Sequence, residues 1–350
     1  MTTEAGLPRV VFTDPTWALD ESGRPSLARA DVERQVLGPG VRLELGVLDG
    51  TFVTAGPRFL DHVRDAHALV INRCEVTPEL VEVIAPTCRI VVRGGVGVDN
   101  LRMPLLEAAG IEAVNIPDYC GDEVSTHALA LLLALERGVC VQDRAVRADA
   151  WDVHHGGTPR RTASRSVGIV GFGRIGRATS RKLQAFYSRV YAFDPYVHPD
   201  VMASHGVQAA ESLADLLARV DAVLLHAELT DETRGMIDDE ALAAARPGTL
   251  LVNVARGGLV DLPAVLRALE AGLLGGYAAD VFSPEDPNAD PIGRRLLARE
   301  DVVVTAHRGF LSAESEASVR RRVAEAVLDA LGPLAAPAAP EARVLARSAL

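Results

Sequence analysis

The sequence has almost no lysine and no closely spaced cysteines. Lys182 is the only lysine, and this scarcity together with many alanines suggests a GC-rich bacterial genome. The four cysteines, Cys74, Cys88, Cys120 and Cys140, lie far apart and form no CxxC pair. That spacing argues against a metal site and against a disulfide framework, and it predicts a location in a reducing cytoplasm.

Basic clusters and long apolar runs are also missing. The formal net charge is −11, so nucleic-acid binding is disfavoured, and a small anionic substrate would have to be held by local positive groups. The longest apolar run, ALALLLAL at 128–135, is far shorter than a membrane span. The start, MTTEAGLPRVVFTD, lacks a basic region followed by an apolar stretch, so no secretion signal and no membrane association are expected.

What the chain does have is a regular alternation of strand-like and helix-like segments. Its 350 residues exceed what one core usually organises, so two domains are expected. Alternation of this kind predicts βαβ units and a parallel sheet with helices on both faces, and six strands complete a dinucleotide-binding fold. The six apolar runs are SVGIV (166–170), RVYAF (189–193), DAVLLH (221–226), TLLVNV (249–254), GYAADVF (276–282) and DVVVTA (301–306).

The first hundred residues show a looser version of this pattern and predict a smaller α/β domain. RVVFTD, VRLELGVL, ALVINR and IVVRGG are its expected strands, with PELVEVI and PLLEAAG as helices. A long helical stretch over about 123–148 would connect the two domains, and an amphipathic helix follows His307. The expected division is 1–118, 119–308, a returning helix at 309–331, and a loose Pro/Ala-rich tail at 332–350.

The segment SVGIVGFGRIG contains Gly171, Gly173 and Gly176 in GxGxxG spacing, after a buried strand and before a helix. That context favours dinucleotide binding, because the first glycine permits the turn, the second lets the backbone approach a pyrophosphate, and the third allows close packing. The next strand ends in Asp194, suited to the ribose hydroxyls, and no arginine follows it, so NAD is preferred over NADP. The alternative is a glycine-rich turn without a ligand, which the strand, helix and acid together disfavour.

Three later strands end in residues with useful chemistry. Arg256 could hold a carboxylate with its planar fork, and His307 could exchange a proton with a carbonyl oxygen while a hydride is transferred. Glu285 could pair with the other ring nitrogen and favour the imidazolium. Asp280 is placed to accept a hydrogen bond from a nicotinamide carboxamide.

Each of these residues alone has a simpler explanation. Arg256 could form an ion pair at a helix start, Glu285 could be a solvated loop acid, and His307 could be an ordinary loop residue. Their occurrence together, after a cofactor motif, favours catalysis.

Several segments resemble the D-isomer-specific 2-hydroxyacid dehydrogenase family from about Val47 to Leu331. They include GGVGVDN, NIPDYCGDEVSTHALALLLAL, GIVGFGRIG, LVNVARGGLVD and AADVFSPEDP. Within the family, NIPDY and AFYSRVYAFDPYV look closest to the branch of the C-terminal-binding corepressors. The resemblance implies a Rossmann NAD-binding domain inserted into a smaller flavodoxin-like substrate domain. It also implies a homodimer through the cofactor domain, with the helix starting near Glu123 at the interface.

The resemblance also assigns residues. It implies that Arg256, Glu285 and His307 are catalytic. The expected substrate-binding residues are Val96, Gly97 and Asn100. Arg73 is added from its residue type alone, because it could accept a second anion of the substrate, and it could equally be a surface ion-pair partner. The expected cofactor-binding residues are Gly171, Gly173, Arg174, Ile175, Gly176, Asp194, Thr233, Val254, Ala255 and Asp280.

Three positions depart from the family pattern. Ala306 stands where a proline usually precedes the catalytic histidine, Glu228 replaces a common proline, and Asp286 follows Glu285 where a proline is usual. The first two should loosen loop geometry, and the third could disturb the pairing of Glu285 with His307.

The sequence therefore predicts an NAD-dependent oxidoreductase that interconverts a 2-oxo acid and a D-2-hydroxy acid. The alternative is an NAD(H)-binding interaction protein of the corepressor type without turnover. The identity of the acid is left open, because it depends on residues of the first domain such as Asn72, Arg73 and Arg93.

Overall fold

The computed structural model describes residues 6–14, 16–22, 24, 26–46 and 56–332. The predicted loose tail lies outside the described residues, except for its first residue. The chain divides into two units, one formed by Met1–Tyr119 with Ala313–Leu350 and the other by Cys120–Ser312. These boundaries fall one and four residues beyond the expected ones.

The first unit is built on a parallel sheet of five strands with the order β2-β1-β3-β4-β5. This is the flavodoxin-like order 2-1-3-4-5. The fifth strand was not expected, because half of its EAVN sequence is polar. The strands are β1 (Arg9–Phe12), β2 (Arg42–Leu45), β3 (Ala68–Ile71), β4 (Ile90–Arg93) and β5 (Glu112–Asn115).

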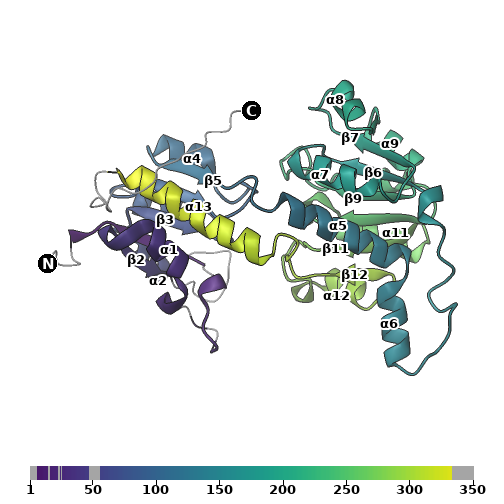
Figure 1. Ribbon diagram of the computed structural model, residues 1–350, viewed down its shortest axis with the longest axis horizontal. Helices are drawn as coiled ribbons and strands as arrows, with labels where there is room; N and C mark the ends of the chain where they lie inside the picture. Colours follow the sequence, from purple (N-terminus) through teal and green to yellow (C-terminus); the bar gives the residue numbers. More distant parts are fainter. Residues whose placement is uncertain (1–5, 15, 23, 25, 47–55, 333–350) are drawn as a thin grey trace. The chain divides into compact units, whose positions relative to one another are not determined.

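The last helix of the chain belongs to this first unit. It packs against α1, β3 and β4. Figure 1 shows it beside α1 and β3. The guanidinium of Arg320 lies 4.2 Å from the centre of the Trp17 ring and bonds to the buried carboxylate of Glu33 at 2.7 Å. The helices of the unit are α1 (Asp31–Leu37), α2 (Pro57–Val63), α3 (Pro78–Ile84), α4 (Met103–Ala108) and α13 (Ala313–Leu331), with short 3-10 turns at Thr16–Ala18, Leu27–Arg29 and Gly38–Gly40.

The second unit contains a parallel sheet of seven strands, with the order β12-β11-β10-β9-β6-β7-β8. The six strands from β8, at one edge, to β11 repeat the dinucleotide-binding order 3-2-1-4-5-6. The strand before His307, β12, is an added seventh at the other edge. The predicted count of six missed β8, which has only two residues. The strands are β6 (Ser166–Val170), β7 (Arg189–Phe193), β8 (Gln208–Ala209), β9 (Ala222–Leu225), β10 (Thr249–Asn253), β11 (Leu274–Ala279) and β12 (Val302–Val304).

Helices lie on both faces of this sheet (Figure 1). The single helical stretch predicted over 123–148 is wrong, because it is divided into two helices bent by 60°. The break falls at Gly138, whose φ of 61° lies in the left-handed region that glycine adopts without strain. The helices are α5 (Gly121–Glu136), α6 (Val139–Arg147), α7 (Arg174–Leu183), α8 (Pro199–Ser204), α9 (Leu213–Arg219), α10 (Asp239–Ala243), α11 (Leu262–Glu270) and α12 (Pro291–Leu297), with 3-10 turns at Thr162–Ser164, Gly257–Leu259 and Pro287–Ala289.

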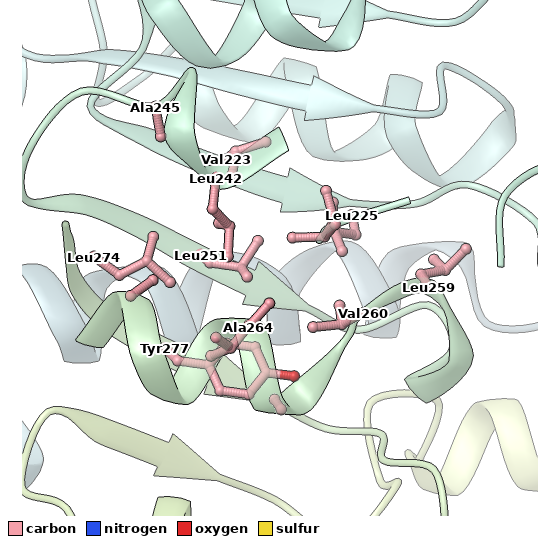
Figure 2. Close-up of a cluster of buried hydrophobic side chains, with 14 of the residues drawn as sticks. Val223, Leu225, Leu242, Ala245, Leu251, Leu259, Val260, Ala264, Leu274 and Tyr277 are labelled. Carbon is pink, nitrogen blue, oxygen red and sulfur yellow. The ribbon is translucent and has the colours of Figure 1, made fainter. Parts of the chain in front are cut away.

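The main apolar core of the second unit lies between the sheet and its covering helices (Figure 2). Val223 and Leu251 come from neighbouring strands, Leu242 from α10 and Ala264 from α11, and all four are almost fully buried. Burying a leucine or valine side chain contributes roughly 1.5–3 kcal/mol. This packing holds β9, β10 and β11 in fixed register, so the residues at their carboxyl ends have fixed positions.

Within the described ranges, no single helix has the length and apolar composition needed to cross a membrane. The bent pair α5 and α6 meets those two criteria only when taken together.

Candidate active site

The glycine-rich loop after β6 is closely packed on one side and open on the other. Gly171 has a φ of 90°, and a Cβ there would lie 2.5 Å from the amide nitrogen of Ala227. A Cβ at Gly176 would lie 2.1 Å from the carbonyl oxygen of Gly171. Around Gly173, in contrast, no described atom beyond its two neighbours in the chain lies within 4 Å of an added Cβ. The loop therefore leaves space for a ligand at its middle glycine, as a pyrophosphate requires.

The first turn of α7 provides the amides for such a ligand. Its first main-chain bond runs from Arg177 N–H to Gly173 O. The N–H groups of Arg174 and Ile175 donate to no protein group among the described residues. These amides carry the partial positive charge of a helix N-terminus, so the loop fits the phosphates of a dinucleotide.

Asp194 lies beside this loop at the end of β7. One carboxylate oxygen accepts the Phe172 N–H at 2.7 Å, and the other accepts the Tyr196 N–H at 2.9 Å. Both oxygens retain further lone pairs for ribose hydroxyls.

The remaining predicted cofactor residues lie on neighbouring loops. Thr233 closes the loop after β9, because its hydroxyl donates to Glu228 O at 2.6 Å. After β10, Val254 is buried and the Ala255 N–H donates to the side-chain oxygen of Asn253 at 3.1 Å. All three therefore lie beyond the carboxyl ends of adjacent strands, where parallel sheets bind ligands.

Glu285 and His307 are in direct contact. The Oε1 atom of Glu285 lies 2.5 Å from Nδ1 of His307. Both side chains are partly exposed, at 43% and 26%. The contact occupies one ring nitrogen and leaves Nε2 available to a substrate. The carboxylate of Asp286 instead accepts the N–H of Asn288 at 2.9 Å, so the second acid does not disturb this pair.

Arg256 lies at the same sheet edge, beyond β10 and separated from β12 by β11. Its Nη1 donates to Ala255 O at 2.8 Å. A Cβ on Gly257 would lie 2.0 Å from the carbonyl carbon of Phe282, so the main chain after Arg256 packs against the loop leading to Glu285.

Asp280, at the end of β11, is only 3% exposed. Its Oδ1 accepts the N–H of Arg308 at 2.9 Å and its Oδ2 accepts that of Gly309 at 2.8 Å. Burial acts to raise the pKa of Asp280, but hydrogen bonds from His127, Thr305, Gly309 and Arg308 outweigh it and lower the pKa. The carboxylate is thus ionised and directed toward the turn that carries His307.

In the first unit, the predicted substrate loop follows β4. The N–H groups of Val96 and Gly97 donate to no group in the part of the chain that the structure describes, and both residues are partly exposed. Two adjacent free amides suit a carboxylate. Asn100 holds this region together, since its Nδ2 donates to Asn72 O at 3.0 Å and to Cys74 O at 2.9 Å.

The main chain around Arg73 is held by Asp14 as well as by Asn100. The buried carboxylate of Asp14 accepts the N–H groups of Asn72 and Arg73. Burial raises the pKa of Asp14 despite these bonds. Arg93 lies over the substrate loop, because a Cβ on Gly95 would fall 1.3 Å from its Nη1.

Two residues of the site were not predicted. His127 on α5 has Nε2 2.9 Å from the hydroxyl oxygen of Thr305 and 3.4 Å from Oδ1 of Asp280. Thr305 donates to the same carboxylate. An ionisable ring within the apolar helical run THALALLLAL is the one sequence feature that could have drawn attention to His127.

The order of the strands is that of a dinucleotide-binding fold, and a contact between a carboxylate and an imidazole lies at the carboxyl ends of its strands. A family model for the NAD-binding domain of the D-isomer specific 2-hydroxyacid dehydrogenases matches residues 129–309. The chain is also 36% identical over 293 residues to an (S)-sulfolactate dehydrogenase of Chromohalobacter salexigens, covering 81% of this chain and 91% of the relative. The chain belongs to the D-isomer specific 2-hydroxyacid dehydrogenase family.

Other relatives are longer. A D-3-phosphoglycerate dehydrogenase of Mycobacterium leprae is 38% identical over 293 residues, which cover 83% of this chain and 54% of the relative. The chain spans about half the length of the phosphoglycerate dehydrogenases it matches. Among solved structures, a D-lactate dehydrogenase from Aquifex aeolicus complexed with NAD and lactic acid superposes with a TM-score of 0.79. The two sequences are 22% identical, and the superposition covers 91% of this chain and 94% of the D-lactate dehydrogenase chain. This likeness shows the fold alone.

Proposed function

We propose that the protein is an NAD-dependent dehydrogenase that interconverts a 2-oxo acid and a D-2-hydroxy acid. Bound NAD would supply or accept the hydride at the substrate C2. His307 would give a proton from Nε2 to the carbonyl oxygen in reduction and take it back in oxidation. Arg256 would hold the substrate carboxylate, and Glu285 would orient His307 and stabilise its charged form.

The observation that carries this proposal is the contact between Glu285 and His307 at the sheet edge that also bears the cofactor loop. A catalytic histidine needs a partner that fixes its ring and leaves the other nitrogen free. Ionisable groups arranged in this way beside a dinucleotide loop favour acid–base chemistry over a purely structural role.

The test follows NADH absorbance with glyoxylate, pyruvate and hydroxypyruvate, and with 2-oxo acids that bear a phosphate or sulfonate. Turnover by the wild type should fall by about 10²–10⁴-fold in His307→Ala, while NADH affinity changes by no more than a few-fold. Tight NADH binding without turnover on any of these acids would instead support the interaction protein related to the corepressor branch.

A substrate with a second anion is the more specific proposal. Arg73 and Arg93 both belong to the segments around the free amides of Val96 and Gly97. Two of the relatives are named for phosphoglycerate and sulfolactate, which carry a phosphate and a sulfonate. A kcat/KM at least about ten-fold higher for a doubly anionic acid than for pyruvate would support this assignment.

We also propose that NAD is preferred over NADP. The carboxylate of Asp194 would repel a 2′-phosphate, and the neighbouring Tyr196 hydroxyl donates to another acid, Glu232, at 2.7 Å. Comparison of KM for NADH and NADPH tests this preference directly.

A homodimer formed through the cofactor unit is a further proposal. Trp151 and Val153, in the segment after α6, are 90% and 83% exposed, and Val139 and Val146 on α6 are also exposed. Large apolar side chains exposed close together are typical of an interface. Sedimentation of the wild type and of Trp151→Glu should distinguish dimer from monomer. We propose a cytoplasmic location as well, because the four cysteines, all within the described residues, form no disulfide bond.

A further inference from the structure

The turn that carries His307 has an unusual main-chain conformation. His307 has a φ of 49°, in the left-handed region that residues other than glycine seldom adopt. Such a conformation costs about 1–3 kcal/mol and persists only where the surroundings impose it. In this chain the residue before His307 is Ala306, so no proline ring restricts the turn.

Asp280 supplies the restraint. The N–H of His307 donates to Asp280 O at 2.8 Å. The next two N–H groups, those of Arg308 and Gly309, donate to the carboxylate of the same residue. Three consecutive amides are therefore held by the residue that directly follows β11, and the direction of the His307 side chain depends on the orientation of Asp280.

The orientation of Asp280 depends in turn on His127. The hydroxyl of Thr305 has one proton and donates it to Oδ1 of Asp280. The Nε2 atom of His127, 2.9 Å from that hydroxyl oxygen and 3.4 Å from Oδ1, must then carry a hydrogen and donate it. His127 thus fixes both the rotamer of Thr305 and the carboxylate of Asp280.

The packing around this network leaves little freedom. A Cβ on Gly309 would lie 2.9 Å from Oδ2 of Asp280 and 3.3 Å from Cδ2 of His127. The helix that bears His127, α5, packs against β10, β11 and β12. The ring is therefore presented by a rigid element, which is what a positioning group requires.

We propose that His127 is a positioning residue for catalysis, acting through Thr305 and Asp280 to keep the His307 ring on Glu285. This inference rests on the proposed dehydrogenase function and adds a residue that touches neither substrate nor cofactor. Loss of the His127 donor would leave the turn able to relax from its left-handed conformation, and the acid–base pair would separate.

Steady-state kinetics over a range of pH test the proposal. His127→Ala should lower kcat by about ten-fold while KM for NADH and for the 2-oxo acid stays within about two-fold. The pH at which kcat falls should also move to lower pH, because His307 spends less time on Glu285. His127→Gln places an amide N–H near the position of Nε2 and should recover most of the lost kcat.

Two further variants make the test specific. Thr305→Val keeps the shape of the side chain, removes the link and should reproduce the loss without further loss when combined with His127→Ala. His155→Ala makes the same change beyond α6, where Nε2 of the ring lies 3.7 Å from Oε2 of Glu300, and should leave kcat unchanged. If His127→Ala does not fold, His127→Gln and Thr305→Val still measure the effect.

An unchanged kcat and pH profile in His127→Ala and Thr305→Val would overturn the proposal, as would a failure of His127→Gln to recover any activity. A wild type without turnover on any 2-oxo acid would overturn the dehydrogenase function instead. In that case an NMR titration of the His307 ring, compared between wild type and His127→Ala, still decides the inference: a shifted titration supports it and an unchanged one refutes it.

Discussion

The carboxylate of Glu285 lies against the imidazole of His307, with 2.5 Å between Oε1 and Nδ1. The two residues are 22 positions apart, and β12 together with the loop after β11 brings them together. The contact fixes which nitrogen faces the carboxylate and which remains for chemistry. It also places the carboxylate directly beside the ring.

Glu285→Gln should therefore move the pH profile of kcat to lower pH. The amide keeps the shape of the side chain but removes the negative charge that favours the imidazolium. We expect kcat measured at neutral pH to fall by about ten-fold or more, since the ring loses the carboxylate that orients it for proton transfer.

The neighbouring acid provides a matched control for this change. Asp286→Asn makes the same exchange of acid for amide at a residue whose carboxylate bonds to Asn288 and not to His307. It should leave the profile in place. A Glu285→Gln profile identical to that of Asp286→Asn would remove Glu285 from the mechanism.

The second and third glycines of the cofactor motif, Gly173 and Gly176, should respond differently to alanine. In Gly176→Ala the new methyl group collides with Gly171 O, so unfolding should require roughly 1–3 kcal/mol less free energy. In Gly173→Ala the methyl group meets no protein atom, so the melting temperature should not change, but NADH should bind about ten-fold more weakly. Thermal melts and NADH fluorescence titrations measure the two effects, and equal loss of stability in both variants would contradict the assignment of space at Gly173 to a ligand.

His226, which follows β9, should make the protein less stable at mildly acid pH. Burial lowers its pKa from 6.5 to about 4, and its Nε2 has no hydrogen-bond partner among the described residues. Between these values the unfolded chain binds a proton that the folded chain does not, so stability present above pH 6.5 is lost as the pH falls toward 4. The loss should be on the order of 2–3 kcal/mol, and His226→Gln should show a flatter decline in urea unfolding over this range. Parallel curves for the two proteins would exclude this role.

Cysteine reactivity gives a simple check of the core of the first unit, which contains Cys74 and Cys88. Burial raises the pKa of the Cys74 and Cys88 thiols to about 12, and Cys120 is also buried. Because the thiolate is the reactive form, a thiol reagent at pH 8 should modify only Cys140 in the native protein and all four cysteines after unfolding. Rapid modification of Cys74 or Cys88 without denaturant would show that the first unit opens readily.

Much of the fold could be predicted because the main strands are short apolar runs that alternate with amphipathic helices. The cofactor loop could be predicted because its glycines have fixed spacing. The two-residue β8 and the half-polar β5 could not, since pairing at a sheet edge needs no apolar pattern. The break at Gly138 was hidden because the residues on both sides of it favour helix.

The chemistry of the site was only partly accessible from the sequence. The identities of Glu285 and His307 suggested their roles, but the contribution of His127 depends on a contact across 178 positions. The restraint at His307 depends on main-chain amides directed at Asp280, and backbone donors leave no trace in composition or spacing.

The return of α13 to the first unit has a consequence for synthesis on the ribosome. Its buried residues Val319, Val323 and Val327 complete the same core as Val10 of β1 and Val92 of β4. The segment Cys120–Ser312, in contrast, contains every strand of its own sheet and can close as soon as it has emerged. The half of the molecule that is translated first is therefore the half that finishes folding last.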